Sequence, residues 1–208
     1  MREAAGGPAT SGRPAMSGGP RDPRVARSRR VVIEAAVELL VERGFAATTV
    51  EAIATRSGAA KTTIYRHWPD KAAVLREAIE SMVPVASAPD TGSLRGDLIH
   101  FTEELADILA TPPTSALVPG LVDVAERDAD LARLLAEFTA NRRMPVHAAL
   151  TRAIERGEIS RTSDPELVTG LLLGPLFYRR LLARQPLDAA FLGWLVDTVI
   201  GVVGGDRG

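Results

Sequence analysis

Residues 48–71 read TTVEAIATRSGAAKTTIYRHWPDK, and this stretch decides the fold. It predicts two short helices joined by a tight turn. Thr48 is followed three residues later by Glu51, the spacing of a capping box, so we expect a helix to begin here. Apolar residues then recur at helical spacing, and Ser57-Gly58 ends the helix because glycine adopts the left-handed conformation without a Cβ penalty. The next helix begins within about two residues, as in a helix-turn-helix.

The second of these helices has a packing side and a polar side. It ends at Pro69, because the residue before a proline is pushed out of the helical region. At about 100° per residue, the packing side holds Ala60, Ile64, His67 and Trp68. The other side holds Lys61, Thr62, Thr63, Tyr65 and Arg66. A cation, hydroxyls, a phenol and a guanidinium suit phosphate oxygens and base edges in a major groove.

Residues 58–71, GAAKTTIYRHWPDK, resemble the recognition-helix signature of the TetR family of one-component bacterial repressors. The shared pattern is a glycine, small residues, a basic residue, an aliphatic position, a tyrosine and an aromatic-Pro-x-Lys exit. Two positions depart from it: Ala60 stands where the family often has serine, and Trp68 where phenylalanine is usual. The specific resemblance covers about residues 24–86. Beyond that, only the number of helices and the two closing helices agree.

The resemblance implies an all-α homodimer with a three-helix DNA-binding head and a helical body, about nine helices in total. The body would bind a small molecule and dimerise through its last two helices. Residues 1–23 are expected to be a disordered tail, 24–86 the head and 87–208 the body. The implied function is transcriptional repression at a double-stranded DNA operator, released when a small molecule shifts the fourth helix. The DNA-contacting residues would be Arg29, Thr48, Thr49, Lys61, Thr62, Thr63, Tyr65, Arg66, His67 and Lys71.

Charge is distributed unevenly along the chain, although the formal net charge is only −1. Residues 24–71 carry nine Lys/Arg and five Asp/Glu, residues 72–208 carry thirteen and nineteen, and residues 1–23 add a net charge of +1. Phosphate attraction acts locally, since salt screens it beyond about 10 Å. The basic excess therefore coincides with the helix-turn-helix.

An amphipathic helix is expected in the segment that begins at Arg24, and it ends at Gly44. Its first turn is basic, although the helix macrodipole favours anions at that end. Either at least one of these residues contacts phosphates, or they form a solvated run. They are Arg24, Arg27, Arg29 and Arg30.

The remaining patterns are also helical. A helix from residue 71 ends near Pro84, and the loop 87–93 is the best domain boundary. Further helices are expected at about 94–110, 115–125, 130–156, from 164 and at 188–202, with a kink or break at Pro145. The longest apolar stretch, 167–178, is shorter than the ~20 residues that cross a bilayer. A cytoplasmic protein is expected.

Two sets of residues in the second half are candidates for binding. An apolar cavity between helices would be lined by His100, Phe101, Phe138, Met144, His147 and Phe177, with plain core packing as the alternative. The last two helices carry more apolar surface than one core face needs, which indicates a partner. The expected dimer residues are Leu171, Tyr178, Phe191, Trp194, Leu195 and Thr198.

Nothing in the sequence predicts catalysis, a metal site or a cofactor. The chain has no cysteine and three histidines, and it lacks H-E-x-x-H, glycine-rich phosphate-loop and G-x-S-x-G motifs. Three interpretations remain: a ligand-released repressor, an effector-independent DNA-binding dimer, and a helical enzyme or scaffold with a vestigial helix-turn-helix. An enclosed cavity in the body favours the first over the second, and selective DNA binding separates both from the third.

Overall fold

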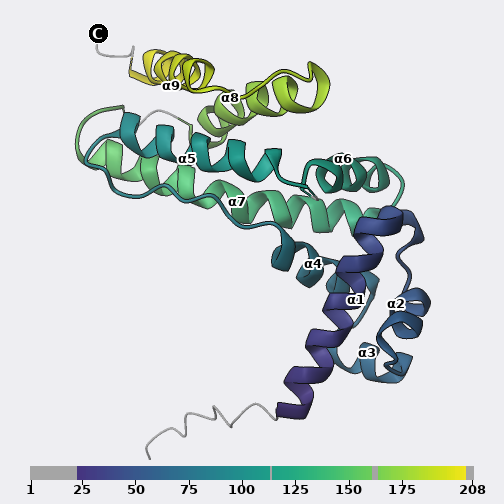
Figure 1. Cartoon of the computed structure of the whole chain (residues 1–208). Helices are drawn as coiled ribbons and strands as arrows, with labels where there is room; N and C mark the ends of the chain where they lie inside the picture. The colour runs from purple at the N-terminus through teal and green to yellow at the C-terminus, as the bar shows by residue number, and fades with distance from the viewer. Residues whose placement is uncertain (1–22, 113, 161–163, 205–208) are drawn as a thin grey trace, which may run out of the picture.

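The computed structural model describes residues 23–112, 114–160 and 164–204, and every element within these ranges is helical (Figure 1). The elements are α1 Pro23–Ala47, α2 Val50–Ser57, α3 Lys61–His67, α4 Lys71–Met82, α5 Leu94–Ala110, α6 Thr114–Ala125, α7 Ala129–Glu155, α8 Pro165–Phe177, a π-helix Tyr178–Leu182, and α9 Ala189–Gly204. The predicted all-α class is confirmed for this part of the chain. The tail expected over residues 1–23 lies outside the described residues, except that Pro23 already begins α1.

The head is built by α1 to α3 around one apolar centre, with α4 against it. The regular winding of α1 stops at Gly44, where φ is 71° and ψ is −177°, a conformation that glycine adopts without a steric penalty. α2 and α3 then pack beside α1, and Ile53 and Ile64 lose all their exposed surface between the three helices. Apolar residues at helical spacing therefore specify the head, as the sequence predicts.

The body consists of α5 to α9. The long helices α5 and α7 lie side by side, α6 covers the end nearest the head, and α8 and α9 lie on the opposite side of α5 and α7 from the head (Figure 1). A kink or a break is expected at Pro145, and of these two the break is not present, because α7 is one helix through this residue. Within the described residues, no helix combines the length and the apolar character that crossing a membrane requires.

Contacts from both α1 and α4 join the head to the body. On α4, Arg76 forms an ion pair of 2.5 Å with Glu137 of α7. At the end of α1, the buried ring of Phe45 lies against α6, so close that a Cβ on Gly120 would be 3.4 Å from the ring. The orientation of the head is therefore tied to both α6 and α7.

The loop before α5 is held to the body by a buried carboxylate. Asp97 has no exposed surface. It accepts hydrogen bonds of 2.7 Å from both the amide and the hydroxyl of Thr91, and one of 3.0 Å from Arg152 of α7. Burial alone would raise the pKa of Asp97, but the hydrogen bonds from Thr91 and Arg152 outweigh it and hold the pKa below its usual range.

Candidate nucleic-acid interface

The helix-turn-helix starts one residue later than the capping box predicts. Thr49 is the N-cap of α2, and its hydroxyl accepts a hydrogen bond of 3.1 Å from the amide of Ala52. Thr48 is fully buried and donates a 2.7 Å hydrogen bond to the carbonyl of Gly44. The predicted cap at Thr48 is wrong, because carbonyls at the end of α1 also lack helical partners and Thr48 satisfies one of them. We therefore remove Thr48 from the predicted DNA contacts.

α3 presents its polar side to solvent and buries its apolar side. Ile64 and Trp68 are buried in the head, whereas Lys61, Thr62 and Arg66 are exposed and Thr63 is half-buried. The side chain of Tyr65, at 49% exposure, is accessible despite its size. The surface that the sequence predicts for contact with DNA is thus formed, and it lies at the end of the molecule farthest from α8 and α9 (Figure 1). Ala60 was expected on the packing side but is exposed.

Lys61 is paired with a carboxylate on α2. Its ammonium lies 2.6 Å from Glu51, and this hydrogen bond is the main reason why the pKa of Glu51 lies below its usual range. Both side chains are more than half exposed. Exposed pairs of this kind contribute little to stability, so Lys61 can exchange Glu51 for a phosphate oxygen or a base edge at small cost.

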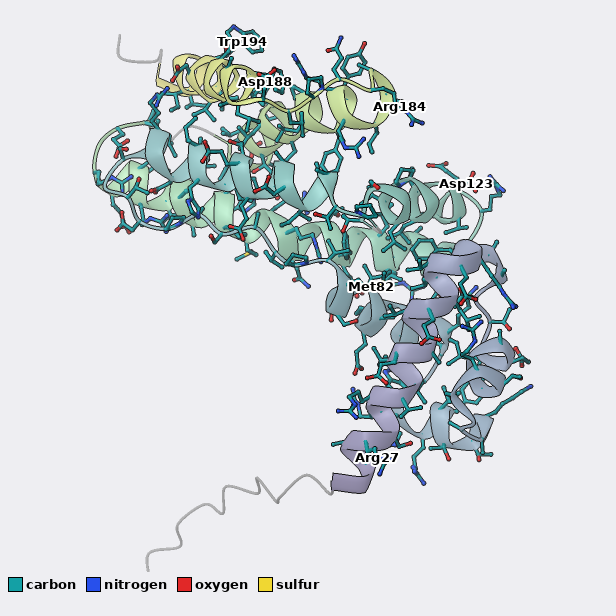
Figure 2. The ribbon with its side chains drawn as sticks, viewed as in Figure 1. Arg27, Met82, Asp123, Arg184, Asp188 and Trp194 are labelled. Atoms are coloured by element: carbon teal, nitrogen blue, oxygen red, sulfur yellow. The ribbon has the colours of Figure 1, made fainter. Side chains whose placement is uncertain are left out.

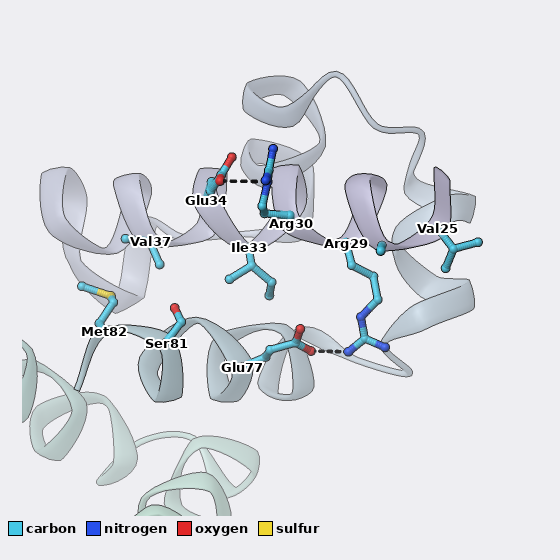
Figure 3. A pocket seen from close by; sticks show the side chains of 10 residues that line it. Val25, Arg29, Arg30, Ile33, Glu34, Val37, Glu77, Ser81 and Met82 are labelled. Atoms are coloured by element: carbon cyan, nitrogen blue, oxygen red, sulfur yellow. Dashed lines mark hydrogen bonds and ion pairs between the residues drawn. The ribbon is translucent and has the colours of Figure 1, made fainter. Parts of the chain in front are cut away.

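Arg29 is engaged behind α3. Arg29 donates to a carboxylate oxygen of Glu77 on α4 at 2.6 Å (Figure 3). The indole N–H of Trp68 donates to the same oxygen at 2.8 Å. The guanidinium also lies 5.2 Å from the centre of the Trp68 ring. The three side chains fix α3 against α1 and α4. The tryptophan in place of the usual phenylalanine therefore adds a hydrogen bond, which its apolar character alone does not suggest.

Arg27 is a better candidate for a phosphate contact from the same helix. It is exposed at the free end of α1 (Figure 2) and lines a shallow groove with Ser57, Gly58 and Ala59 of the turn before α3. Within the described part of the chain no carboxylate pairs with it, whereas Arg30 pairs with Glu34 at 3.4 Å. The run of arginines in the sequence indicates a basic helix end, but it does not indicate which arginine is free to contact a phosphate.

Substitution of the two arginines should separate their roles. We expect Arg27→Ala to reduce the slope of log affinity against log salt concentration by about one unit for each head that contacts DNA. The free energy of unfolding of this variant should be unchanged. Arg29→Ala should leave the slope nearly unchanged and lower the free energy of unfolding by about 1 kcal/mol, because Glu77 loses a hydrogen-bond donor. Anisotropy titrations at four salt concentrations and urea unfolding measure both. If only Arg29→Ala changed the salt dependence of the affinity, Arg29 and not Arg27 would be the arginine that contacts phosphate.

Two further predicted phosphate contacts also make contacts within the head. The ammonium of Lys71 donates to the carbonyl of Phe45 at 3.3 Å. His67 is half-buried with its ring edge-on to Trp68 at 5.6 Å, and its Nε2 has no hydrogen-bond partner in the structure. Lys71 thus ties the start of α4 to α1, His67 packs at the end of α3, and the contact of both residues with DNA stays a prediction.

The body contains an apolar cavity of about 120 Å³ between the chain after α4 and helices α5 to α8. Three of the predicted residues line it: Phe101, Phe138 and Phe177. The other three predictions are wrong, because these side chains lie elsewhere on α5 and α7. The side chain of His100 is exposed, and its Nε2 lies 3.8 Å from the carboxylate of Glu104. Met144 is 60% exposed, and Nε2 of His147 lies 3.6 Å from the carboxylate of Glu166.

Arg142 also lines this cavity, and the sequence gives no signal for it. It stands beside Arg143 in a polar part of α7, which predicts two solvated cations. The guanidinium carbon of Arg142 instead lies 3.4 Å from the centre of the Phe138 ring. Both arginines line the cavity, and among the described residues Arg143 alone has a carboxylate partner there, Glu166 of α8.

α8 and α9 expose an apolar surface on the side away from the head. Of the predicted dimer residues, Leu171, Tyr178, Trp194 and Thr198 are exposed, and Phe191 is half-buried and stacks on Trp194 at 6.2 Å. Trp194 projects from the outer side of α9 (Figure 2). Leu195 is 2% exposed and packs in the core, so its assignment to the interface is wrong. Further exposed apolar residues are Leu167 on α8, Leu182 on the π-helix that also holds Tyr178, and Val202 on α9.

Two family models match the chain. Residues 32–78 match "Bacterial regulatory proteins, tetR family", and residues 88–199 match "Tetracyclin repressor-like, C-terminal domain". The first covers the helix-turn-helix and the second covers α5 and most of the body, through residue 199 of α9.

Curated relatives are similar over most of their length. The uncharacterized HTH-type transcriptional regulator YdeS of Bacillus subtilis is 32% identical over 176 residues, which are 84% of this chain and 88% of the relative. The DNA-binding transcriptional repressor TetR of Mycobacteroides abscessus is 34% identical over 176 residues, 83% and 91% of the two chains.

Solved structures have the same fold. The TetR family transcription regulator SCO0332 superposes with a TM-score of 0.65 at 32% identity, over 84% of this chain and 97% of the other. The Flavonoid-responsive Regulator FrrA gives 0.66 at 24% identity, over 88% and 100%, which shows the fold alone. Together with the outward-facing α3, these matches establish that the chain belongs to the TetR family of DNA-binding transcriptional regulators.

Proposed function

We propose that this protein is a homodimeric repressor that a small molecule releases from operator DNA. The observation that carries the proposal is the arrangement of three surfaces along one molecule. The exposed polar side of α3 lies at one end, the exposed apolar surface of α8 and α9 lies at the other, and the apolar cavity lies between them beside the chain that leaves α4. The relative named as a DNA-binding transcriptional repressor supports the direction of regulation.

Dimerisation follows from the surface of α8 and α9. Large side chains such as Tyr178 and Trp194 are more than 60% exposed there. Contiguous exposed apolar surface marks an interaction site, and the commonest soluble assembly pairs the same patch across a two-fold axis. Two heads related by that axis would contact two half-sites, about one helical turn or more apart, as in dimeric helix-turn-helix proteins.

The ligand acts through α4. One end of this helix holds Asp70 and Lys71 beside α3, and the other end leads directly to Val83 and Pro84 in the cavity wall. A molecule that binds better when α4 is displaced would favour the head orientation that does not fit DNA, because a ligand shifts an equilibrium only by its differential affinity for the two states. The cavity favours this mechanism over an effector-independent dimer. We keep residues 24–86 and 87–208 as the proposed head and body.

DNA selection tests the proposal. Double-stranded fragments bound by the purified protein from a random pool should converge on a two-fold symmetric motif, occupied by two chains. Because operator DNA of a bacterium lies in its cytoplasm, we expect the protein to act there. Fragments without a common motif, or a motif bound by a single chain, would contradict the proposal. No catalytic step, metal or cofactor enters it.

A further inference from the structure

The charge of Arg142 has no counter-ion in the cavity wall. Among the described lining residues, Arg142 and Arg143 are the charged ones, and the others are apolar or threonine. Arg143 is paired with Glu166 of α8 at 2.5 Å. No ion pair joins Arg142 to a carboxylate in the described part of the chain, and its hydrogen bonds go to neutral carbonyls, of Val83 at 2.5 Å and of Phe138 at 3.4 Å.

The environment of Arg142 is unfavourable for a cation. Its Nε is buried and has no hydrogen-bond partner in the structure, and its guanidinium lies on the Phe138 ring. Burial lowers the pKa of Arg142 to about 10. The negative charge of Glu80 acts in the opposite direction and raises this pKa, but it does so without an ion pair. A buried charge is costly unless it is paired and hydrogen-bonded. An anionic group beside this guanidinium would therefore be strongly favoured.

We propose that the effector is a small apolar carboxylic acid whose carboxylate binds Arg142 and whose apolar part fills the cavity between Phe101, Phe138 and Phe177. This rests on the proposed release by a ligand. The guanidinium offers a fork of donors that matches a carboxylate. The volume of about 120 Å³ is close to that of a cavity that holds one benzene ring. An acid with one aromatic ring or a short alkyl chain fits both features.

The same arginine would couple binding to the head. Its donor to Val83 holds the first residue after α4 against α7. A carboxylate competes with that carbonyl for the guanidinium, and as the stronger acceptor it would take the hydrogen bond. The end of α4 then keeps the Arg76–Glu137 pair but loses its tie to Arg142. Release of α4 at this end is the differential contact that regulation needs.

Calorimetric titration of the full chain without DNA tests the chemistry of the ligand. The probes are benzoate, phenylacetate and hexanoate, each compared with its neutral amide. We expect at least one acid to bind with a dissociation constant below about 1 mM and about ten-fold or more tightly than its amide. Amides that bind as tightly as the acids would overturn the proposal, and so would acids that all fail to bind. This comparison needs no variant.

Two variants locate the contact. Arg142→Gln keeps a donor for Val83 but removes the charge, so the preference for the acid should fall to about two-fold or less. Arg133→Gln is the matched control, because Arg133 lies on the same helix outside the cavity lining and is paired with Asp130 at 3.0 Å, and its acid preference should stay within about three-fold of the unmodified protein. An acid preference that survives in Arg142→Gln would contradict the assignment to Arg142.

Binding to DNA separates this proposal from the proposed function. The acid that binds should also displace the protein from its selected DNA, and its amide should not. If the amide displaced the protein from DNA at the same concentration, the proposed release by a ligand would stand, but the proposal that the effector is an acid would be wrong. Binding of the acid with no effect on selected DNA would uphold the carboxylate site and overturn ligand release. The proposed coupling of the acid to α4 through Val83 would then be wrong as well.

Discussion

Replacing Tyr65 with alanine is expected to weaken binding to selected DNA roughly 100-fold, with the melting temperature nearly unchanged. Tyr65 lies in the middle of the exposed side of α3, and the proposed dimer would carry two copies. A good contact to a base edge contributes about 1–3 kcal/mol, so two lost contacts of about 1.4 kcal/mol each amount to about 100-fold. Stability should hold because the side chain is 49% exposed and surface substitutions usually change it by less than about 0.5 kcal/mol.

Fluorescence anisotropy and thermal unfolding on the same preparations measure the two effects. Tyr65→Phe removes only the hydroxyl and serves as the matched control, which separates hydrogen bonding from packing against the DNA. Equal affinity of the alanine variant and the unmodified protein would remove Tyr65 from the interface. A fall in melting temperature of many degrees would show instead that Tyr65 supports the head.

Replacing Trp194 with glutamate is expected to convert the dimer into a monomer and thereby abolish tight DNA binding. The indole is 62% exposed and extends an apolar surface that includes Leu171 and Tyr178. A carboxylate at the centre of such an interface would be buried without a partner in both subunits, a cost of several kcal/mol for each. The dimer should weaken by about 10³-fold or more. A monomer contacts one half-site, so its affinity for the full operator falls as well.

Sedimentation equilibrium at micromolar concentration measures the assembly. Val122→Glu is the matched control: Val122 is an exposed apolar residue on α6, away from the proposed interface, and this variant should remain a dimer. If Trp194→Glu stays dimeric while Val122→Glu dissociates, the interface involves α6 and the assignment to α8 and α9 is wrong.

Local patterns predicted the elements of the head well. The apolar spacing around Ile53 and Ile64 and the left-handed Gly58 fix α2, the turn and the inner side of α3 within a few neighbouring residues. The exposure of Lys61 and Tyr65 follows, since the opposite side of a short amphipathic helix must face solvent. The cap of α2 lies at Thr49, although the spacing to Glu51 favours Thr48. The choice depends on the carbonyl of Gly44, which the local pattern does not contain.

Contacts between distant parts of the chain could not be predicted in this way. Arg29 meets Glu77 across 48 residues, and this pairing withdraws the arginine that the sequence favoured for phosphate. Leu195 belongs to a helix that is apolar on both sides, so composition alone does not tell core from interface. Arg142 reaches the cavity only because α7 turns the side that carries both Phe138 and Arg142 towards Val83. Charged and aromatic side chains need the tertiary arrangement before a role can be assigned.

The central claim is that the exposed side of α3 reads the sequence of DNA. To test this, the affinity for the selected DNA fragment is divided by the affinity for a scrambled fragment, both measured at one physiological salt concentration. The ratio is compared between the unmodified protein and a variant with Lys61, Thr62 and Tyr65 all changed to alanine. The account predicts a ratio of about 10³ or more for the unmodified dimer, and a ratio near one for the variant, which should still be folded and dimeric. A variant that keeps the full ratio would contradict it.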